Sequence, residues 1–256
     1  MEPTHSQLCT GFHNAEEGQK DKLRWYEAIW KSPYHLVTKN LMTQTIAIID
    51  YGMGNLGSVH KAIAYVAPND HIMVTADPSC IAAADRVIFP GQGAARDCMA
   101  AIQQQQLEPV IREAAQQKPF LGICMGLQVL MSRSTENQGT SLLNLFPGQV
   151  QKINTTLDNK TTLPRKIPHM GWNQVTLCQQ HPLWQGIAPN SRFYFVHSYH
   201  IVPDNPNIIS AITEYGQRIT AAIAQGTLFA CQFHPEKSAD IGLQLLRNFV
   251  SWKPAL

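Results

Sequence analysis

The segment Phe120-Leu121-Gly122-Ile123-Cys124-Met125-Gly126 decides the fold expected for this chain. Its apolar first half is typical of a buried strand. Glycines two residues before and two residues after Cys124 let a strand turn sharply into a helix, so that the side chain at the turn projects among backbone N–H groups. The segment therefore predicts a reactive thiol at the end of a strand, in an arrangement suited to acyl transfer.

A downstream segment, Gln232-Phe233-His234-Pro235-Glu236, supplies a base and a carboxylate. Residues i and i+2 of an extended segment point to the same face, so Glu236 can orient the imidazole of His234. His234 can then deprotonate Cys124, and the N-terminus of the helix expected after the elbow would favour the thiolate. We predict a catalytic triad of Cys124, His234 and Glu236.

Apolar runs upstream of Cys124 alternate with helical patterns. Strands are expected at 46–49, 72–74, 86–89 and 120–123, and helices at 57–67 and 96–117, with an interruption at Pro109. Downstream, short alternating segments predict mixed or antiparallel strands near 148–154, 165–177, 192–202, 207–213, 218–224 and 228–233, before a closing helix at 238–252. The fold class is therefore α/β, with an open mixed, mainly parallel sheet, flanking helices and additional antiparallel strands.

We expect two regions: an N-terminal extension, residues 1–43, and one catalytic domain, residues 44–256. The extension is polar, with an aromatic stretch at 25–30 and a break at Pro33. The domain has a complete pattern without it, so a loosely ordered arm is expected. Two alternatives stay open: the aromatic residues could dock on the domain, or Met42 could be the true start of the chain.

The composition excludes several classes of protein. The 256 residues carry a formal net charge of +2, with 15% charged and 44% hydrophobic residues, and no basic block marks a nucleic-acid or membrane surface. No apolar run approaches the roughly 18 residues of a membrane span, and no secretory signal is visible. Six scattered cysteines without a CxxC pair are typical of a reducing compartment. We expect a cytoplasmic protein that binds neither nucleic acid nor membrane.

The segment Gly52-Met53-Gly54-Asn55-Leu56-Gly57 matches the G-x-G-x-x-G fingerprint of dinucleotide sites, and Asp77 stands at the spacing of the ribose-binding acid. Polar Asp50-Tyr51 separates the strand from the first glycine, and Asp77 precedes Pro78 in an expected turn. An oxidoreductase is therefore the weaker hypothesis, and we favour a loop that passes close to another backbone or to a partner.

The segment Pro90-Gly91-Gln92-Gly93 follows a strand parallel to the one that ends at Cys124. It should therefore lie at the same carboxyl edge of the sheet, where its N–H groups can contribute to an oxyanion hole. The alternative is a simple tight turn.

The remaining thiols and imidazoles have simpler interpretations. We expect the other cysteines to be small buried hydrophobes, namely Cys80, Cys98, Cys178 and Cys231. His197 and His200 form an H-x-x-H pattern, but no third ligand at suitable spacing supports a metal. His169 is expected to pack or to lie at an interface. No cofactor or metal is predicted.

Taken together, the segments around Cys124 and His234 resemble the triad motifs of the class I, cysteine-type glutamine amidotransferases. Three more segments resemble the glutaminase subunits of imidazole glycerol phosphate synthases in particular: Ile49–Val59, Pro168–Asn173 and Tyr194–Tyr199. The resemblance extends over about residues 46–252.

The resemblance implies that Cys124 attacks the side-chain amide of L-glutamine, His234 carries the proton to the departing ammonia and Glu236 holds His234. It implies an oxyanion hole at Gly91, Gln92, Gly93 and Met125, with Gln92 standing where many members have valine. It implies glutamine contacts at Gln128, Glu136, Ser198 and Tyr199. It implies a partner interface at Asn55, Trp172, Tyr194 and Lys237.

The resemblance also implies a partner. In that family the ammonia passes through a sheltered channel to a separate (β/α)₈ cyclase, which makes imidazole glycerol phosphate and AICAR in histidine biosynthesis. We therefore expect a heterodimer in which the isolated chain is nearly silent until the cyclase holds its nucleotide ligand. The alternatives are a class I amidotransferase that feeds another synthase, such as that of anthranilate or guanine nucleotides, and a non-catalytic binding module with the same fold.

The assignment of residues 1–43 as a dispensable arm gives the first prediction. Deletion of residues 1–41 should leave folding and amide hydrolysis largely intact, because the domain pattern is complete from Ile46. Thermal unfolding and ammonia release of the shortened and full-length chains test this expectation. A collapse of folding in the shortened chain would refute it.

Overall fold

The computed structural model describes residues 43–154 and 166–254, within the compact unit Thr43–Leu256. Residues 1–42 of the expected extension lie outside the described residues.

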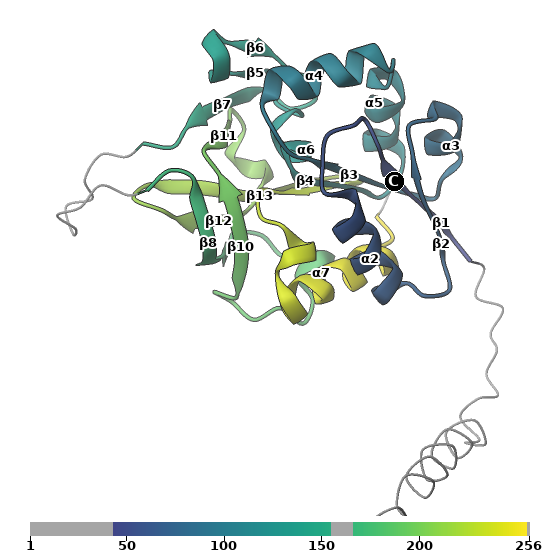
Figure 1. The fold of residues 1–256 in the computed structure, drawn as a ribbon. Coiled ribbons are helices and arrows are strands. Elements are labelled where there is room, and N and C mark those ends of the chain that lie inside the picture. The colour runs from purple at the N-terminus through teal and green to yellow at the C-terminus, as the bar shows by residue number, and fades with distance from the viewer. Residues whose placement is uncertain (1–42, 155–165, 255–256) are drawn as a thin grey trace, which may run out of the picture. The chain divides into compact units, whose positions relative to one another are not determined.

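The centre of the domain is an eight-stranded sheet in the order β2-β1-β3-β4-β14-β13-β12-β9 (Figure 1). The first five strands are mutually parallel: β2 (His71–Thr75), β1 (Thr45–Ile49), β3 (Arg86–Gly91), β4 (Phe120–Cys124) and β14 (Leu228–Cys231). The last three continue antiparallel: β13 (Arg218–Gln225), β12 (Ile209–Glu214) and β9 (Thr176–Leu177). The predicted mixed, mainly parallel sheet is confirmed.

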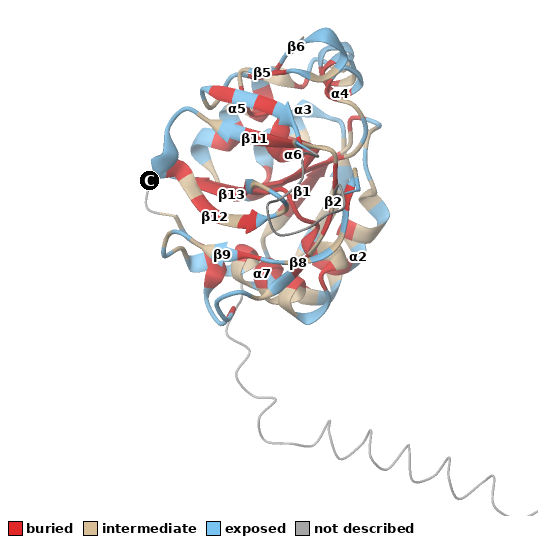
Figure 2. Cartoon of the chain, turned by 90° about the vertical axis from the view of Figure 1, so that its left-hand side faces the viewer, coloured by how far each residue is buried: buried red, intermediate tan, exposed pale blue. Residues whose placement is uncertain are grey.

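Helices cover both faces of this sheet, as the alternation predicts. On one face lie α3 (Pro78–Ala83), α4 (Ala95–Gln104) and α5 (Glu108–Gln117), and on the other α2 (Leu56–Val66) and α7 (Ala239–Ser251) (Figure 1). A hydrophobic core lies between the sheet and the helices on each face, and strand β4 contributes to both. Phe120 packs on the face of α3, α4 and α5, whereas Leu121 and Ile123 pack on the face of α2 and α7. Figure 2 shows buried residues concentrated on the central strands, which explains why these strands are apolar throughout.

The segment expected as one interrupted helix at 96–117 is two helices. The chain between them reverses through Gln106, which has a φ of 55°. Pro109 lies in the first turn of α5, where a proline loses no helical hydrogen bond. Pro109 therefore marks the start of the second helix rather than a defect within the first.

Two smaller sheets lie beside the carboxyl edge of the main one. Strands β8 (His169–Gln174) and β10 (Arg192–His197) form an antiparallel ribbon. The other sheet has the order β11-β7-β5-β6, from β11 (Tyr199–Pro203), β7 (Gly148–Lys152), β5 (Arg133–Ser134) and β6 (Thr140–Ser141). The single segment expected at 192–202 therefore breaks at Ser198 and supplies strands to two sheets.

Short helices complete the described part of the chain: α6 (Met125–Gln128), η2 (Glu136–Gln138), η3 (Pro182–Trp184), η4 (Pro206–Ile208) and η5 (Pro235–Lys237). Within the described ranges, no helix has the length and apolar character needed to span a membrane.

The glycine fingerprint at 52–57 does not pack as a dinucleotide site requires. The third glycine of such a site brings helix and strand together, but a Cβ on Gly57 would meet nothing within 4 Å. A Cβ on Gly54 would lie 3.7 Å from the Cα of Gly91, so the loop passes close to a second backbone. Asp77 caps helix α3 by accepting a hydrogen bond from the N–H of Ser79. Close backbone approach therefore explains Gly54, and helix capping explains Asp77, without a dinucleotide.

Two glycines give a matched test of this packing. Gly126 faces the carbonyl oxygen of Phe89 with no room for a Cβ, whereas exposed Gly57 lies in α2 with open space around it. Gly126→Ala should destabilise the domain by about 3 kcal/mol because backbone cannot yield to the new methyl group. Gly57→Ala should stabilise it by up to about 1 kcal/mol. Urea unfolding measures both, and equal effects would contradict the packing described here.

Candidate active site

Cys124 occupies the turn between β4 and α6 with φ 55° and ψ −106°, a backbone conformation that a cysteine rarely adopts. The flanking glycines make this turn possible, since a Cβ on Gly122 would lie 2.8 Å from the Cβ of Ala230, and one on Gly126 would clash with Phe89. The predicted elbow is therefore present. The expected helix after the elbow is α6, and because it has only four residues its N-terminal field is weaker than that of a long helix.

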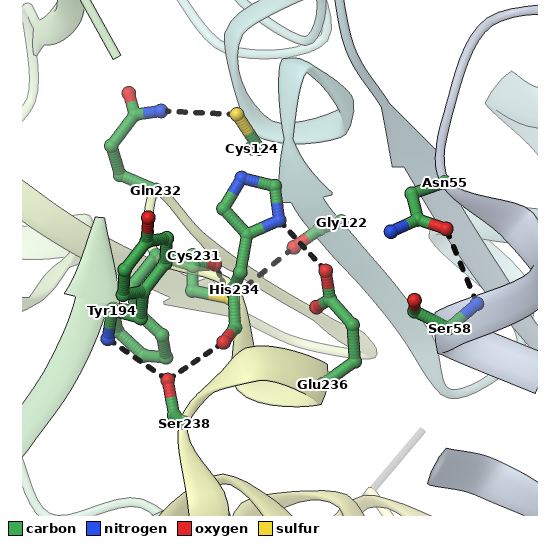
Figure 3. Close-up of polar contacts among 11 residues, drawn as sticks. Asn55, Ser58, Gly122, Cys124, Tyr194, Cys231, Gln232, His234, Glu236 and Ser238 are labelled. Carbon is green, nitrogen blue, oxygen red and sulfur yellow. Dashed lines mark hydrogen bonds and ion pairs between the residues drawn. The ribbon is translucent and has the colours of Figure 1, made fainter. Parts of the chain in front are cut away.

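His234 and Glu236 come together below the thiol, on the segment that follows β14 (Figure 3). The Nδ1 of His234 lies 2.8 Å from Oε1 of Glu236, and both side chains are almost fully buried. Figure 3 shows the imidazole between Cys124 and Glu236, with its second nitrogen toward the sulfur. Among the described residues, that nitrogen, Nε2, has no hydrogen-bond partner.

The charge state of His234 is set by two opposing effects. Burial favours the neutral ring, but the neighbouring Cys124 and Glu236 outweigh burial and raise the pKa of His234 to about 10. A proton is therefore held on the imidazole at neutral pH, next to the sulfur. This is the arrangement that a thiolate nucleophile with a general acid needs.

A cavity of about 460 Å³ opens beside Cys124. It is lined by Gln92, Gly93, Cys124, Met125, Gln128, Glu136, Pro168, Val196, His197, Ser198, Tyr199, His234 and Lys237. The structure thus brings together, at one cavity, most of the residues expected for the oxyanion hole and for glutamine contacts, although they come from distant parts of the sequence. Such a cavity is large enough for a free amino acid.

Gly91 lies behind the cavity wall, where it pairs with Cys124 across the β3–β4 ladder. Its missing side chain leaves room for the hydroxyl of Tyr51. That hydroxyl approaches Sγ of Cys98, and Cys98 in turn donates to the carbonyl oxygen of Gln92 at 3.4 Å. Cys98 was expected to be a small buried hydrophobe; it is buried, but it also fastens the loop at Gln92.

The other expected hydrophobes differ from one another. Cys231 is fully buried, whereas Cys80 is half-buried and Cys178 is exposed, so the prediction of a buried position is wrong for Cys178. The sequence pattern does not distinguish these cases, because Cys178 lies just beyond β9 and its exposure depends on neighbours distant in the chain.

Glu136 has a structural contact in addition to its place at the cavity. Its Oε2 accepts a hydrogen bond of 2.8 Å from the N–H of Ala95, at the start of α4, where Ala94 offers no capping side chain. A glutamine contact at Glu136 stays a prediction, and the contact with Ala95 links Glu136 to the loop that ends at Gly93.

The residues expected at a partner interface fall in three places. Trp172 and Tyr194 face each other across the β8–β10 ribbon with ring centroids 6.2 Å apart, and Trp172 is 45% exposed. Lys237 lines the cavity, and Asn55 caps α2 through its side-chain oxygen (Figure 3). The two histidines of the H-x-x-H pattern have different partners, since His197 pairs with His169 and His200 with Gln217.

Sequence reasoning assigned no role to Gln232, although it stands in the quoted motif. Its Nε2 lies 3.7 Å from Sγ of Cys124, and its Oε1 accepts from Nε2 of Gln128 at 3.0 Å. The sequence did contain a signal for this contact. Gln232 stands two residues before His234, and residues i and i−2 of an extended segment point to the same face, here toward Cys124.

The family model for class-I glutamine amidotransferases matches residues 47–252 of this chain. The chain belongs to the class I glutamine amidotransferase family. Two relatives are imidazole glycerol phosphate synthase subunit HisH of Methylococcus capsulatus and subunit HisH 1 of Pseudomonas aeruginosa. Each is 51% identical over 211 residues, which is 82% of this chain and 97% and 98% of the relative, respectively. The resemblance predicted from the motifs is confirmed.

Two solved structures share the fold at low identity. PurLQS from Thermotoga maritima aligns with a TM-score of 0.61 at 15% identity, over 82% of this chain and 98% of that one. A solved glutamine amidotransferase aligns with a TM-score of 0.59 at 13% identity, over 80% of this chain and 96% of that one. These similarities support the fold alone.

The carboxylate of Glu236 can be tested through its effect on His234. Glu236→Gln removes the negative charge beside Nδ1, so the pKa of His234 should fall from about 10 toward the ordinary histidine value. Imidazole titration followed by NMR measures this shift. Glu113→Gln, at an exposed position on α5, is the control and should leave the titration unchanged. An unaltered titration in Glu236→Gln would contradict the assignment.

Proposed function

We propose that this chain hydrolyses L-glutamine to glutamate and ammonia through a thioester on Cys124. The ammonia is passed to the cyclase subunit of imidazole glycerol phosphate synthase, in histidine biosynthesis. The observation that carries this proposal is the buried His234–Glu236 pair beneath a cysteine at a strained elbow, in the wall of an amino-acid-sized cavity. The identity of about one half to HisH subunits supports the choice of synthase.

In the first half of the reaction, the thiolate of Cys124 attacks the side-chain amide carbon of glutamine. The negative charge on the amide oxygen is met by N–H groups of Met125 and of the loop Gly91–Gly93. Within the described part of the chain, the N–H groups of Gln92 and Gly93 donate to no other residue. His234 gives its proton to the departing nitrogen, the C–N bond breaks and ammonia leaves a thioester.

In the second half, His234 takes a proton from water, and the hydroxide formed attacks the thioester carbon. The C–S bond breaks, glutamate leaves, and the proton returns the pair to its starting state. Glu236 keeps the ring in one orientation through both steps, because the 2.8 Å contact fixes Nδ1 and leaves Nε2 toward the sulfur.

Glutamine itself is held by the groups on the far side of the cavity. The carboxylate of Glu136 is suited to the ammonium group of the amino acid. Ser198 and Tyr199 present backbone at the break between two strands, and Gln128 lies beside them. The carbonyl oxygen of Tyr199 already accepts from Gln128 and faces Nδ1 of His197, so it is not the atom that contacts glutamine.

The partner is a (β/α)₈ cyclase that forms a heterodimer with this chain. The β8–β10 ribbon supports this part of the proposal, because Met170 is 62% exposed beside the half-exposed ring of Trp172. Large exposed apolar side chains of this kind mark interaction surfaces. Asn55, Tyr194 and Lys237 are proposed to contact the same partner. The five described cysteines are free, which suits a cytoplasmic setting.

Ammonia release from glutamine tests the reaction. The chain together with its cyclase and the cyclase's nucleotide ligand should release ammonia, and the isolated chain should release far less. Cys124→Ala should abolish turnover, because no other thiol of residues 43–154 and 166–254 lines the cavity. Cys178→Ala, which removes an exposed thiol, is the matched control and should keep full activity. Turnover retained in Cys124→Ala, or full activity without the cyclase, would sink the corresponding part of the proposal.

Binding of the cyclase tests the interface. Trp172→Ala should weaken association about thirtyfold, by about 2 kcal/mol, since a tryptophan that becomes buried on binding is a common anchor of interfaces. Tyr65→Ala removes another exposed aromatic ring, on α2, and should not change the affinity. Calorimetric titration of both variants with the cyclase compares them. Equal affinities for the Trp172 variant and the unaltered chain would place the interface elsewhere.

A further inference from the structure

Two buried histidines take no part in the proposed reaction. His169 on β8 and His197 on β10 stand opposite each other in the ribbon, and Nδ1 of His169 lies 2.8 Å from Nε2 of His197. The ring of His169 is stacked between Phe195 and Tyr215, with centroids 4.8 and 4.0 Å away. Both side chains are buried, and between two ring nitrogens at this distance one must donate and the other must accept.

The surroundings decide which nitrogen donates. Nδ1 of His197 lies 2.8 Å from the carbonyl oxygen of Tyr199, which can only accept, so Nδ1 carries a proton. Burial lowers the pKa of His197 to about 3, so the ring is neutral and its Nε2 is an acceptor. His169 therefore donates from Nδ1.

Asn173 fixes the other end of the pair. Its Nδ2 lies 3.2 Å from Nε2 of His169 and also donates to the carbonyl oxygen of Glu214 at 2.9 Å. Its Oδ1 accepts from the N–H of Gln174 at 2.8 Å, so two backbone contacts agree on the orientation of the amide. The donated protons thus run in one direction, from Asn173 through both histidines to the carbonyl of Tyr199.

The same carbonyl joins this pair to the nucleophile. It accepts a second hydrogen bond of 3.0 Å from Nε2 of Gln128, which also donates to Oε1 of Gln232 at 3.0 Å. Nε2 of Gln232 then faces Sγ of Cys124 at 3.7 Å (Figure 3). Gln128 and Gln232 are both buried, and Gln128 also borders the cavity beside Cys124.

We propose that this hydrogen-bonded chain positions the donor of Gln232 on the sulfur of Cys124, and that Asn173, His169 and His197 are positioning residues for the nucleophile. Each member donates in one fixed direction, so a substitution at the β8–β10 ribbon alters the hydrogen bond that Gln232 donates to the thiolate. Asn173 directly follows Trp172 of the surface proposed for the partner, and its side chain points to the opposite face of β8, toward His169. The expected effect on glutamine hydrolysis rests on the proposed function, whereas the hydrogen bonds themselves do not depend on it.

Two substitutions at His169 separate hydrogen bonding from packing. His169→Phe keeps a ring between Phe195 and Tyr215 but has no N–H, whereas His169→Asn keeps an amide N–H near the position of Nδ1 and loses the ring. His169→Phe should lower kcat for glutamine in the complex about fivefold, with KM within about twofold. His169→Asn should keep more than half of kcat. A packing role alone requires the reverse order, which would overturn the proposal.

A double-mutant cycle tests the continuity of the chain. Gln232→Leu removes the donor on the sulfur, so it should lower kcat at least as much as His169→Phe. The double variant should then be no slower than Gln232→Leu alone, because both changes remove the same donation. Effects that multiply in the double variant would show two independent roles and would overturn the proposal.

Alkylation of Cys124 by iodoacetamide at pH 7 gives a readout without glutamine or partner. Quantified by mass spectrometry of the Cys124 peptide, the rate should fall about fivefold in His169→Phe and in Gln232→Leu, with exposed Cys178 as the internal control. Unchanged alkylation with active glutamine hydrolysis would reject the chain and leave the proposed function. If the alkylation rates fall as expected but the protein releases no ammonia from glutamine, the hydrogen-bonded chain is supported and the proposed function is rejected.

Thermal unfolding identifies variants that fail to fold. If His169→Phe fails to fold, His169→Gln replaces it. The longer side chain of glutamine carries its amide near the position of Nε2, so this variant also lacks a donor at the position of Nδ1. The same fivefold losses are expected from it, and wild-type rates would overturn the proposal.

Discussion

The close approach of the turn at Cys124 to strand β3 is the constraint on which the site depends. Gly126 lies against the carbonyl of Phe89, and Gly91 pairs with Cys124 across the β3–β4 ladder. These contacts hold the thiol at φ 55°, so that the sulfur stands clear of the sheet and beside the loop at 91–93. The base, the loop and the cavity are arranged around a sulfur that the backbone has already placed.

Two buried histidines near this sulfur, His234 and His197, show how the surroundings decide the charge of an imidazole. His234 has the Glu236 carboxylate and the Cys124 sulfur beside it, and these raise its pKa in spite of burial. His197 faces a carbonyl and a second imidazole, and burial keeps it neutral. The first ring can therefore carry a proton to a leaving group, while the second can only hold a fixed donor direction.

The sequence predicted the strands before the elbow and the elbow itself, because fully buried strands are apolar throughout and glycines mark close backbone approaches. It did not predict the break at Ser198, which divides one extended segment between two sheets. Nor did it show the contact between Cys98 and Gln92, the cap that Glu136 provides for α4, or the exposure of Cys178. Each of these depends on a neighbour that is distant in the chain and leaves no periodic pattern.

By itself, the sequence determined the fold class and the family, and it predicted a nucleophile with its base and carboxylate, since these follow from local spacing and from motifs. Only the tertiary structure decided which groups meet at the sulfur. Gln232 reaches Cys124, Gln128 joins Gln232 to Tyr199, and the two histidines continue the chain to Asn173. The physical reason is that hydrogen bonds between distant segments depend on how sheets are placed against one another, whereas periodicity records only which face of each segment is buried.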